Sequence, residues 1–220
     1  MTKFPWIVSA DELFALRGSG GQPFVEFASA LLNAQASVSG ISLSLVRTNV
    51  KVNLPDGGID AEVGRPLGGP LQIEERTCWQ FKSTSFAEIT ESVIRSEVAK
   101  PEASRLICAG HAYVLCVCDD APSEKLNALE KLLAKAVSAI SSRAAPPRLL
   151  GAGHLASWAS SHPGVVLAFF RHQLSDGLAF EPWLKKERAE LAQFVVLPGR
   201  KESAVAIQRH VAHETPPSPI

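Results

Sequence analysis

The sequence lacks several features that would assign a chain to a common class. No apolar run approaches the roughly 20 residues that a membrane helix requires, and residues 1–10 lack the charged and apolar regions of a secretory signal. We therefore expect a cytoplasmic protein that has no membrane partner. No GxxxxGK[ST] phosphate loop and no internal repeat are present. Nucleotide hydrolysis by a phosphate loop is thereby excluded.

An excess of either charge is also missing, because the 22 basic residues cancel the 22 acidic ones. The chain has no overall electrostatic attraction to nucleic acid, so DNA binding would need a local basic surface, bound metal ions or another part of a larger assembly. The four cysteines lie in hydrophobic segments, as reduced buried thiols do. No second Cys or His pair accompanies Cys116 and Cys118 at zinc-like spacing, which disfavours a zinc site.

The length of 220 residues, 46% of them hydrophobic, suits one main domain with a full core. We expect this domain to span residues 1–175. From Trp183 onward basic residues interleave with acids, and residues 215–219 are rich in proline. Residues 176–220 are therefore expected to form a C-terminal helical or linker segment.

The order of helical and strand-like patterns predicts an α/β layer fold. Apolar residues at three- and four-residue steps indicate helices, and period-two alternation or short apolar runs indicate strands. Helices are expected over residues 24–32, 85–100, 124–142 and 155–160, with Pro101 closing the second. Strands are expected within 41–52 and over 59–63, 77–82, 113–118 and 148–151. Residues 55–58 are expected to form a turn.

Polar side chains share a face on two of the expected strands. Asp60 lies on the outward face of residues 59–63, and Gln80 and Lys82 lie together on one face of residues 77–82. Phosphodiester cleavage requires a hard cation held by oxygen ligands, an attacking water and positive charge in the transition state. Asp60 can supply a carboxylate and Gln80 an amide oxygen. The ammonium of Lys82 can orient or deprotonate the water, or stabilise the charge on the phosphate.

Other residues near this constellation have a simpler interpretation. Glu62 is either a second metal ligand or a surface residue, and the alternating Trp79 and Phe81 are expected in the core. Glu88, Glu91 and Glu97 share their predicted helix with Arg95 and Lys100, which is typical of a solvated face with salt pairs.

The runs Pro55-Asp56-Gly57-Gly58-Ile59-Asp60-Ala61-Glu62-Val63 and Cys78-Trp79-Gln80-Phe81-Lys82 resemble the PD-(D/E)XK nuclease superfamily, most closely its Mrr-like branch. In that branch the glutamate of the ExK motif is commonly a glutamine, as at Gln80. The resemblance covers roughly residues 24–120. It implies a restriction-endonuclease-like αβββαβ core with a mixed central sheet flanked by helices, and cleavage of double-stranded DNA with Mg²⁺ or Mn²⁺.

The same resemblance implies site residues. Asp60, Gln80 and Lys82 would be catalytic, with Asp60, Gln80 and Glu62 at the metal. Some members add a glutamate from the first helix, and Glu26 is the position here that matches.

A second resemblance concerns the longer context. Residues 153–165 and 194–200 look like the connection into a STAND-type NTPase, of which such a nuclease is often the amino-terminal effector in bacterial anti-phage proteins. This implies a defence effector with an NTPase or sensor domain as partner. We expect a magnesium-dependent endonuclease that acts as a homo-oligomer, because one site cuts one strand. Two alternatives stay open: a catalytically inactive module of this fold for nucleic-acid binding or oligomerisation, and a structural adaptor.

Overall fold

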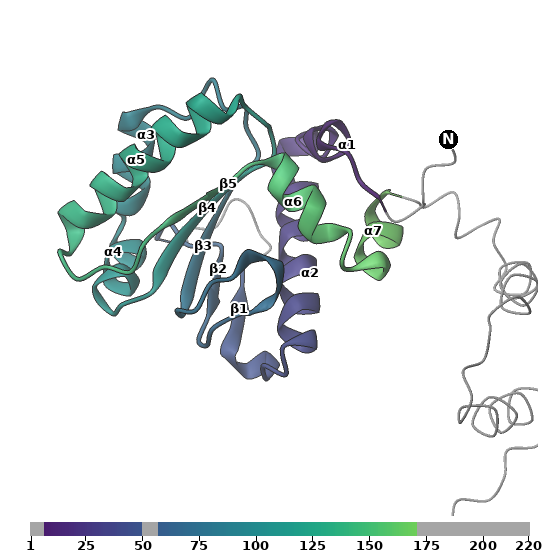
Figure 1. The fold of residues 1–220 in the computed structure, drawn as a ribbon, viewed down its shortest axis with the longest axis horizontal. Coiled ribbons are helices and arrows are strands. Elements are labelled where there is room, and N and C mark those ends of the chain that lie inside the picture. Colours follow the sequence, from purple (N-terminus) through teal and green to yellow (C-terminus); the bar gives the residue numbers. More distant parts are fainter. Residues whose placement is uncertain (1–6, 50–56, 171–220) are drawn as a thin grey trace, which may run out of the picture. The chain divides into compact units, whose positions relative to one another are not determined.

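The centre of the fold is a five-stranded mixed sheet in the order β1-β2-β3-β4-β5. The structure is a computed structural model, and it describes residues 7–49 and 57–170 (Figure 1). β1 (Val46–Thr48), β2 (Ala61–Val63) and β3 (Thr77–Lys82) pair antiparallel. β4 (Ala112–Val117) and β5 (Arg148–Leu150) extend the sheet from β3 as parallel strands. The expected α/β class is confirmed.

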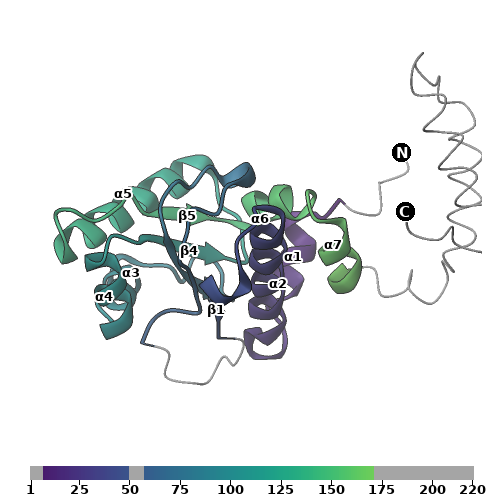
Figure 2. The same ribbon diagram turned by 90° about the horizontal axis from the view of Figure 1, so that it is seen from below.

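Helices cover both faces of this sheet (Figure 1, Figure 2). On one face lie α3 (Glu91–Val98), α4 (Pro101–Cys108) and α5 (Ser123–Ile140). On the other lie α1 (Ala10–Ala15), α2 (Gln22–Val38), α6 (Ala152–Ala159) and α7 (Pro163–Phe170). Short 3-10 turns are η1 (Ser19–Gly21), η2 (Leu43–Leu45) and η3 (Gly69–Leu71).

Each face of the sheet has its own hydrophobic core, because side chains alternate along the strands. Trp79 and Phe81 pack toward α2 and α6 and are 0% and 5% exposed, so their expected place in the core is confirmed. Cys78 and Tyr113 pack on the other side among residues of α3, α4 and α5. Since Gln80 and Lys82 alternate with Trp79 and Phe81, they lie on the face that α3, α4 and α5 cover.

A buried polar network joins α2 to α6. The Oε1 atom of Gln35 accepts hydrogen bonds from Trp158 Nε1 and His162 Nε2, each at 3.1 Å. The Trp158 ring also stacks on Trp79, with ring centroids 5.9 Å apart. Residues 153–165, which look in sequence like a connection into an NTPase, thus form α6 and the start of α7 and belong to this core.

Several sequence-based expectations need correction. The helix expected over residues 85–100 is shorter, because α3 begins only at Glu91, so Glu88 lies before this helix and not on it. Pro101, expected to close a helix, instead occupies the first turn of α4, where its missing N–H leaves no hydrogen bond unmade. Helix α1 was not predicted from the sequence, although Ser9 and Glu12 form a capping box at its start. In the region 41–52, extended structure begins only at Val46, after η2.

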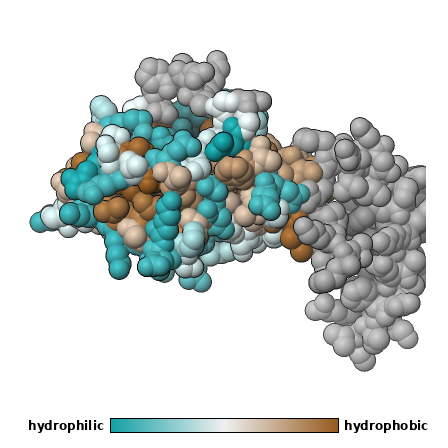
Figure 3. Space-filling model, turned by 90° about the horizontal axis from the view of Figure 1, so that it is seen from above, coloured by the Kyte–Doolittle hydropathy of each residue, from teal (hydrophilic) through white to brown (hydrophobic). Residues whose placement is uncertain are grey.

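Some expectations fall outside the part of the chain that the structure describes. These are the C-terminal segment 176–220, residues 194–200, the positions 55–56 of the expected turn and positions 50–52 of the expected strand. Among the helices of residues 7–49 and 57–170, none has the length and apolar character needed to cross a membrane. The face drawn in Figure 3 carries many hydrophilic side chains, with groups of apolar side chains between them.

Candidate active site

The candidate site lies where β2 begins and β3 ends. These strands are antiparallel neighbours, and the pairing of Ala61 with Trp79 places Asp60 opposite Gln80. The Asp60 N–H donates to the Trp79 carbonyl at 2.8 Å, which extends the ladder by one residue. The register therefore brings together two of the residues that the sequence singled out.

Asp60 and Gln80 are in direct contact and are only 6% and 5% exposed. Asp60 Oδ2 accepts hydrogen bonds from Gln80 Nε2 and from the Phe81 backbone N–H, both at 2.6 Å. The other end of the Gln80 amide is different, because Oε1 is buried and has no hydrogen-bond partner. A buried acceptor without a partner costs about 1–3 kcal/mol, so the structure leaves an oxygen that a cation or a water would satisfy.

The turn before Asp60 is fixed by two glycines in the left-handed region. Gly57 and Gly58 have φ values of +65° and +91°. The Gly57 carbonyl accepts from the backbone N–H groups of Glu102 and Ala103, at 3.2 and 3.3 Å, and so caps the start of α4. The backbone that carries Asp60 is thereby attached to the helical layer.

Lys82 forms an ion pair with Glu97. Its Nζ atom lies 2.7 Å from Glu97 Oε1, and Glu97 Oε2 lies 2.8 Å from Lys100 Nζ. The sequence-based interpretation of Glu97 as part of a solvated face was wrong, since the residue is 8% exposed. The sequence held a signal for this burial: Glu97 stands three residues after Ile94 and beside Val98, on the buried side of α3.

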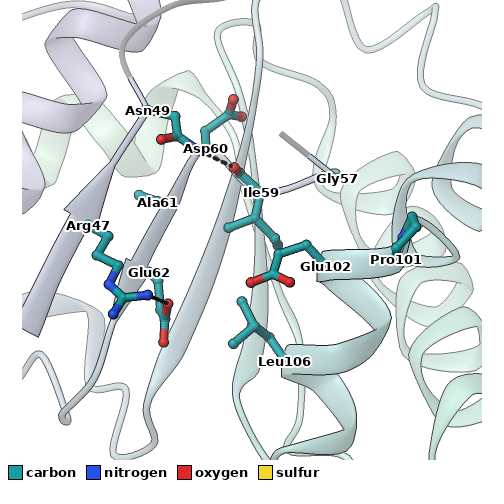
Figure 4. Close-up of a pocket in the computed structure, with 10 residues that line it drawn as sticks. All are labelled: Arg47, Asn49, Gly57, Ile59, Asp60, Ala61, Glu62, Pro101, Glu102 and Leu106. Atoms are coloured by element: carbon teal, nitrogen blue, oxygen red, sulfur yellow. Dashed lines mark hydrogen bonds and ion pairs between the residues drawn. The ribbon is translucent and has the colours of Figure 1, made fainter. Parts of the chain in front are cut away.

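The two further expected residues do not join this group through any contact found in the structure. Glu62 lines the same face of β2 but pairs with Arg47 at 3.8 Å, and its Oε1 lies 3.5 Å from His111 Nε2. Figure 4 shows the carboxylates of Glu62 and Asp60 pointing in different directions. Glu26 is exposed on α2, where its carboxylate accepts from Gln22 Nε2 at 2.9 Å.

A cavity of about 520 Å³ opens beside Asp60 and gives this residue an approach from outside, whereas Gln80 and Lys82 are not among the residues that line it (Figure 4). Its lining combines charged side chains with an apolar floor: Arg47, Asn49, Gly57, Ile59, Asp60, Ala61, Glu62, Pro101, Glu102 and Leu106. A substrate group could therefore reach Asp60 along β2 without displacing the core.

The thiols near the site are not suited to nucleophilic attack. Burial, followed by the charge of Glu62, raises the pKa of Cys78 to about 12. Burial and the charge of Asp60 raise the pKa of Cys116 well above its ordinary value. Because the thiolate is the nucleophile, these buried thiols are inert at neutral pH. Cys108, in contrast to the expectation of burial, is exposed.

The donor set at Asp60 suits a cation that keeps much of its water. Within residues 7–49 and 57–170, no group of three or more His, Cys, Asp or Glu side chains is arranged to hold a metal. Mg²⁺ is commonly bound through one or two carboxylates while it retains several waters. One carboxylate and the partnerless amide oxygen of Gln80 fit that requirement, and a closed zinc-type cage is not needed.

Comparisons with protein-family models, with curated proteins and with solved structures gave no significant match.

Proposed function

We propose that the chain is a metal-dependent DNA endonuclease with a restriction-endonuclease-like core, in which Asp60, Gln80 and Lys82 form the catalytic centre. The observation that carries the proposal is the contact between Asp60 and Gln80 at 2.6 Å, with Gln80 Oε1 buried and without a partner. The end of β3 and the start of β2 would thus supply two oxygen ligands, and an external cavity reaches the one from Asp60.

The proposed roles follow from the chemistry of each side chain. When bound, a divalent cation would activate a water and offset charge on the scissile phosphate. Asp60 and the Gln80 amide oxygen would hold it. Lys82, on the same face of β3 as Gln80, would orient the attacking water or stabilise charge on the phosphate. Its ion pair with Glu97 keeps the ammonium at the end of the strand.

The proposed context follows from the sequence resemblances alone. Cleavage of both strands of a duplex by this site would require two copies of the chain, so the active form would be a homo-oligomer. The endonuclease would be the effector of an anti-phage system whose NTPase or sensor domain controls it.

The proposal is tested by incubating the purified chain with supercoiled plasmid, with Mg²⁺ or Mn²⁺ or with a chelator. We expect nicked and linear products in the presence of the cation only, none from Asp60→Asn, and a rate lower by about 10²–10⁴-fold from Lys82→Met. Asp11→Asn, an exposed acid in α1, is the matched control and should cleave as the wild type does. Cleavage that survives in Asp60→Asn would refute the assignment.

The rival proposal is a catalytically inactive module of the same fold. It is favoured by one observation: Lys82 is engaged by Glu97 and Asp60 by Gln80, so the polar atoms at the site already contact one another. This rival predicts DNA binding that does not depend on metal, and no cleavage with any divalent ion.

A further inference from the structure

Glu97 connects the two halves of the candidate site. Its carboxylate lies 2.7 Å from the ammonium of Lys82 and 2.8 Å from that of Lys100. The Glu97 side chain is 11% exposed. Its Oε2 atom is buried and has no hydrogen-bond partner, so the ion pair with Lys100 offsets the negative charge on this oxygen, as Lys82 does at Oε1. One buried acid on α3 thus fixes the end of β3 from the helical side.

The second half of the connection runs through Lys100 to the turn before Asp60. A Cβ added to Gly58 would meet the Lys100 side chain at 2.7 and 2.8 Å and the Glu97 carbonyl at 3.1 Å. Gly58 therefore lies directly against both residues. Because Gly57 also caps α4, two backbone hydrogen bonds tie this turn to the start of that helix.

From this arrangement we infer that Glu97 is the positioning residue of the site: its carboxylate holds Lys82 and, through Lys100, supports the Gly57–Gly58 turn that carries Asp60. The inference has a catalytic part, an effect of Glu97 on the rate of cleavage, and a holding part, the fixing of the Lys82 side chain. The catalytic part rests on the proposed function. Holding side chains in reactive geometry is a large contribution to catalysis, and a misplacement of about 1 Å can cost about a hundredfold in rate. A buried acid that holds Lys82 is placed to have such an effect.

The other ion pairs of this helical layer differ from that of Glu97. Glu91 pairs with Arg95 and Glu102 with Arg105, each within one helix and each with both side chains at least 40% exposed. Exposed pairs of this kind contribute little. Glu97 joins α3 to β3 through Lys82 and to the N-cap of α4 through Lys100, whereas the pair of Glu91 stays within α3.

The catalytic part is tested by a double-mutant cycle on plasmid cleavage. Glu97→Gln should lower kcat by about tenfold to a hundredfold with little change in KM, and Glu97→Asp should restore part of the rate. In a Lys82→Met background, Glu97→Gln should have less than about a twofold further effect, because it acts through Lys82. Glu91→Gln is the matched control and should keep the wild-type rate.

Two results, one from this cycle and one from Mn²⁺ titration of the same variants, would overturn the inference. One is an equal loss of rate on Glu97→Gln in both backgrounds, which would indicate a general structural role. The other is loss of Mn²⁺ binding in Glu97→Gln, which would make Glu97 a metal ligand instead of a positioning residue. Circular dichroism of each variant identifies misfolding. If Glu97→Gln is misfolded, Glu97→Asp is compared with the wild type in its place.

The holding part is tested without cleavage, by labelling lysines with an amine-acylating reagent and mass spectrometry. Lys82 should be labelled several-fold faster in Glu97→Gln than in wild type, whereas Lys125 on α5 should be unchanged. Equal labelling of Lys82 in both proteins would overturn the inference. If the wild type cleaves no substrate, the proposed function fails and the catalytic part fails with it. The labelling still decides whether Glu97 holds Lys82.

Discussion

Replacement of Gln80 by Glu should have opposite effects on thermal stability in the absence and in the presence of a divalent cation. The variant Gln80→Glu removes the hydrogen bond from the Gln80 amide to Asp60 and places a second carboxylate beside that of Asp60. Residues 60 and 80 are no more than 6% exposed. A hydrogen bond to a charged group contributes about 1.5–3 kcal/mol, and each kcal/mol corresponds to roughly 2–4 °C in the Tm of a domain of this size. Without metal, we therefore expect Tm to fall by roughly 3–12 °C, and charge repulsion adds to this loss.

A divalent cation should reverse the effect, because two facing carboxylates attract it more strongly than a carboxylate and an amide. Saturation at about 100 times Kd adds about 2.7 kcal/mol to stability. Thermal melts in a chelator and in Mg²⁺ measure both effects, with Gln72→Glu, an exposed position with the same charge change, as control. A variant as stable as the wild type in the chelator, or one that Mg²⁺ stabilises no more than it does the wild type, would refute the reasoning.

Three further predictions test the site and its support. Lys82→Met should lower kcat by about 10²–10⁴-fold while Mn²⁺ still binds, as measured by cleavage and titration; an unchanged kcat would remove Lys82 from the mechanism. Gln35→Met should leave the buried donors of Trp158 and His162 without an acceptor and cost roughly 1–3 kcal/mol for each in urea unfolding; a loss below about 0.5 kcal/mol would contradict this. Burial lowers the pKa of His162, so the unfolded chain takes up the proton first and stability should fall as the pH drops below about 6.5. His162→Gln should show a shallower fall in urea unfolding, and an equal slope would contradict the prediction.

The strand β3 shows what the sequence could predict. Its observed bounds, Thr77–Lys82, match the expected ones, because apolar and polar residues alternate without interruption. The same alternation placed Trp79 and Phe81 in the core and Gln80 and Lys82 on the opposite face. The contact between Asp60 and Gln80 follows from the antiparallel pairing of β2 with β3, because strands that are consecutive along the chain commonly pair.

The environment of Lys82 could not be predicted in the same way. Glu97 and Lys100 are close in sequence, so they look like a local pair on a helix surface. That Lys82 points at the same carboxylate depends on how α3 packs across the sheet, and no local pattern contains that information. Pro101 was misinterpreted for a related reason, since a proline ends one helix and begins another with equal ease.

Mn²⁺ titration of the full chain, followed by calorimetry, tests most directly whether Asp60 and Gln80 hold a cation. We expect saturable binding to the wild type, and binding to Asp60→Asn that is weaker by at least tenfold, since the substitution removes the carboxylate at the centre of the site. Binding of equal strength to both proteins, or no binding to the wild type, would contradict this expectation.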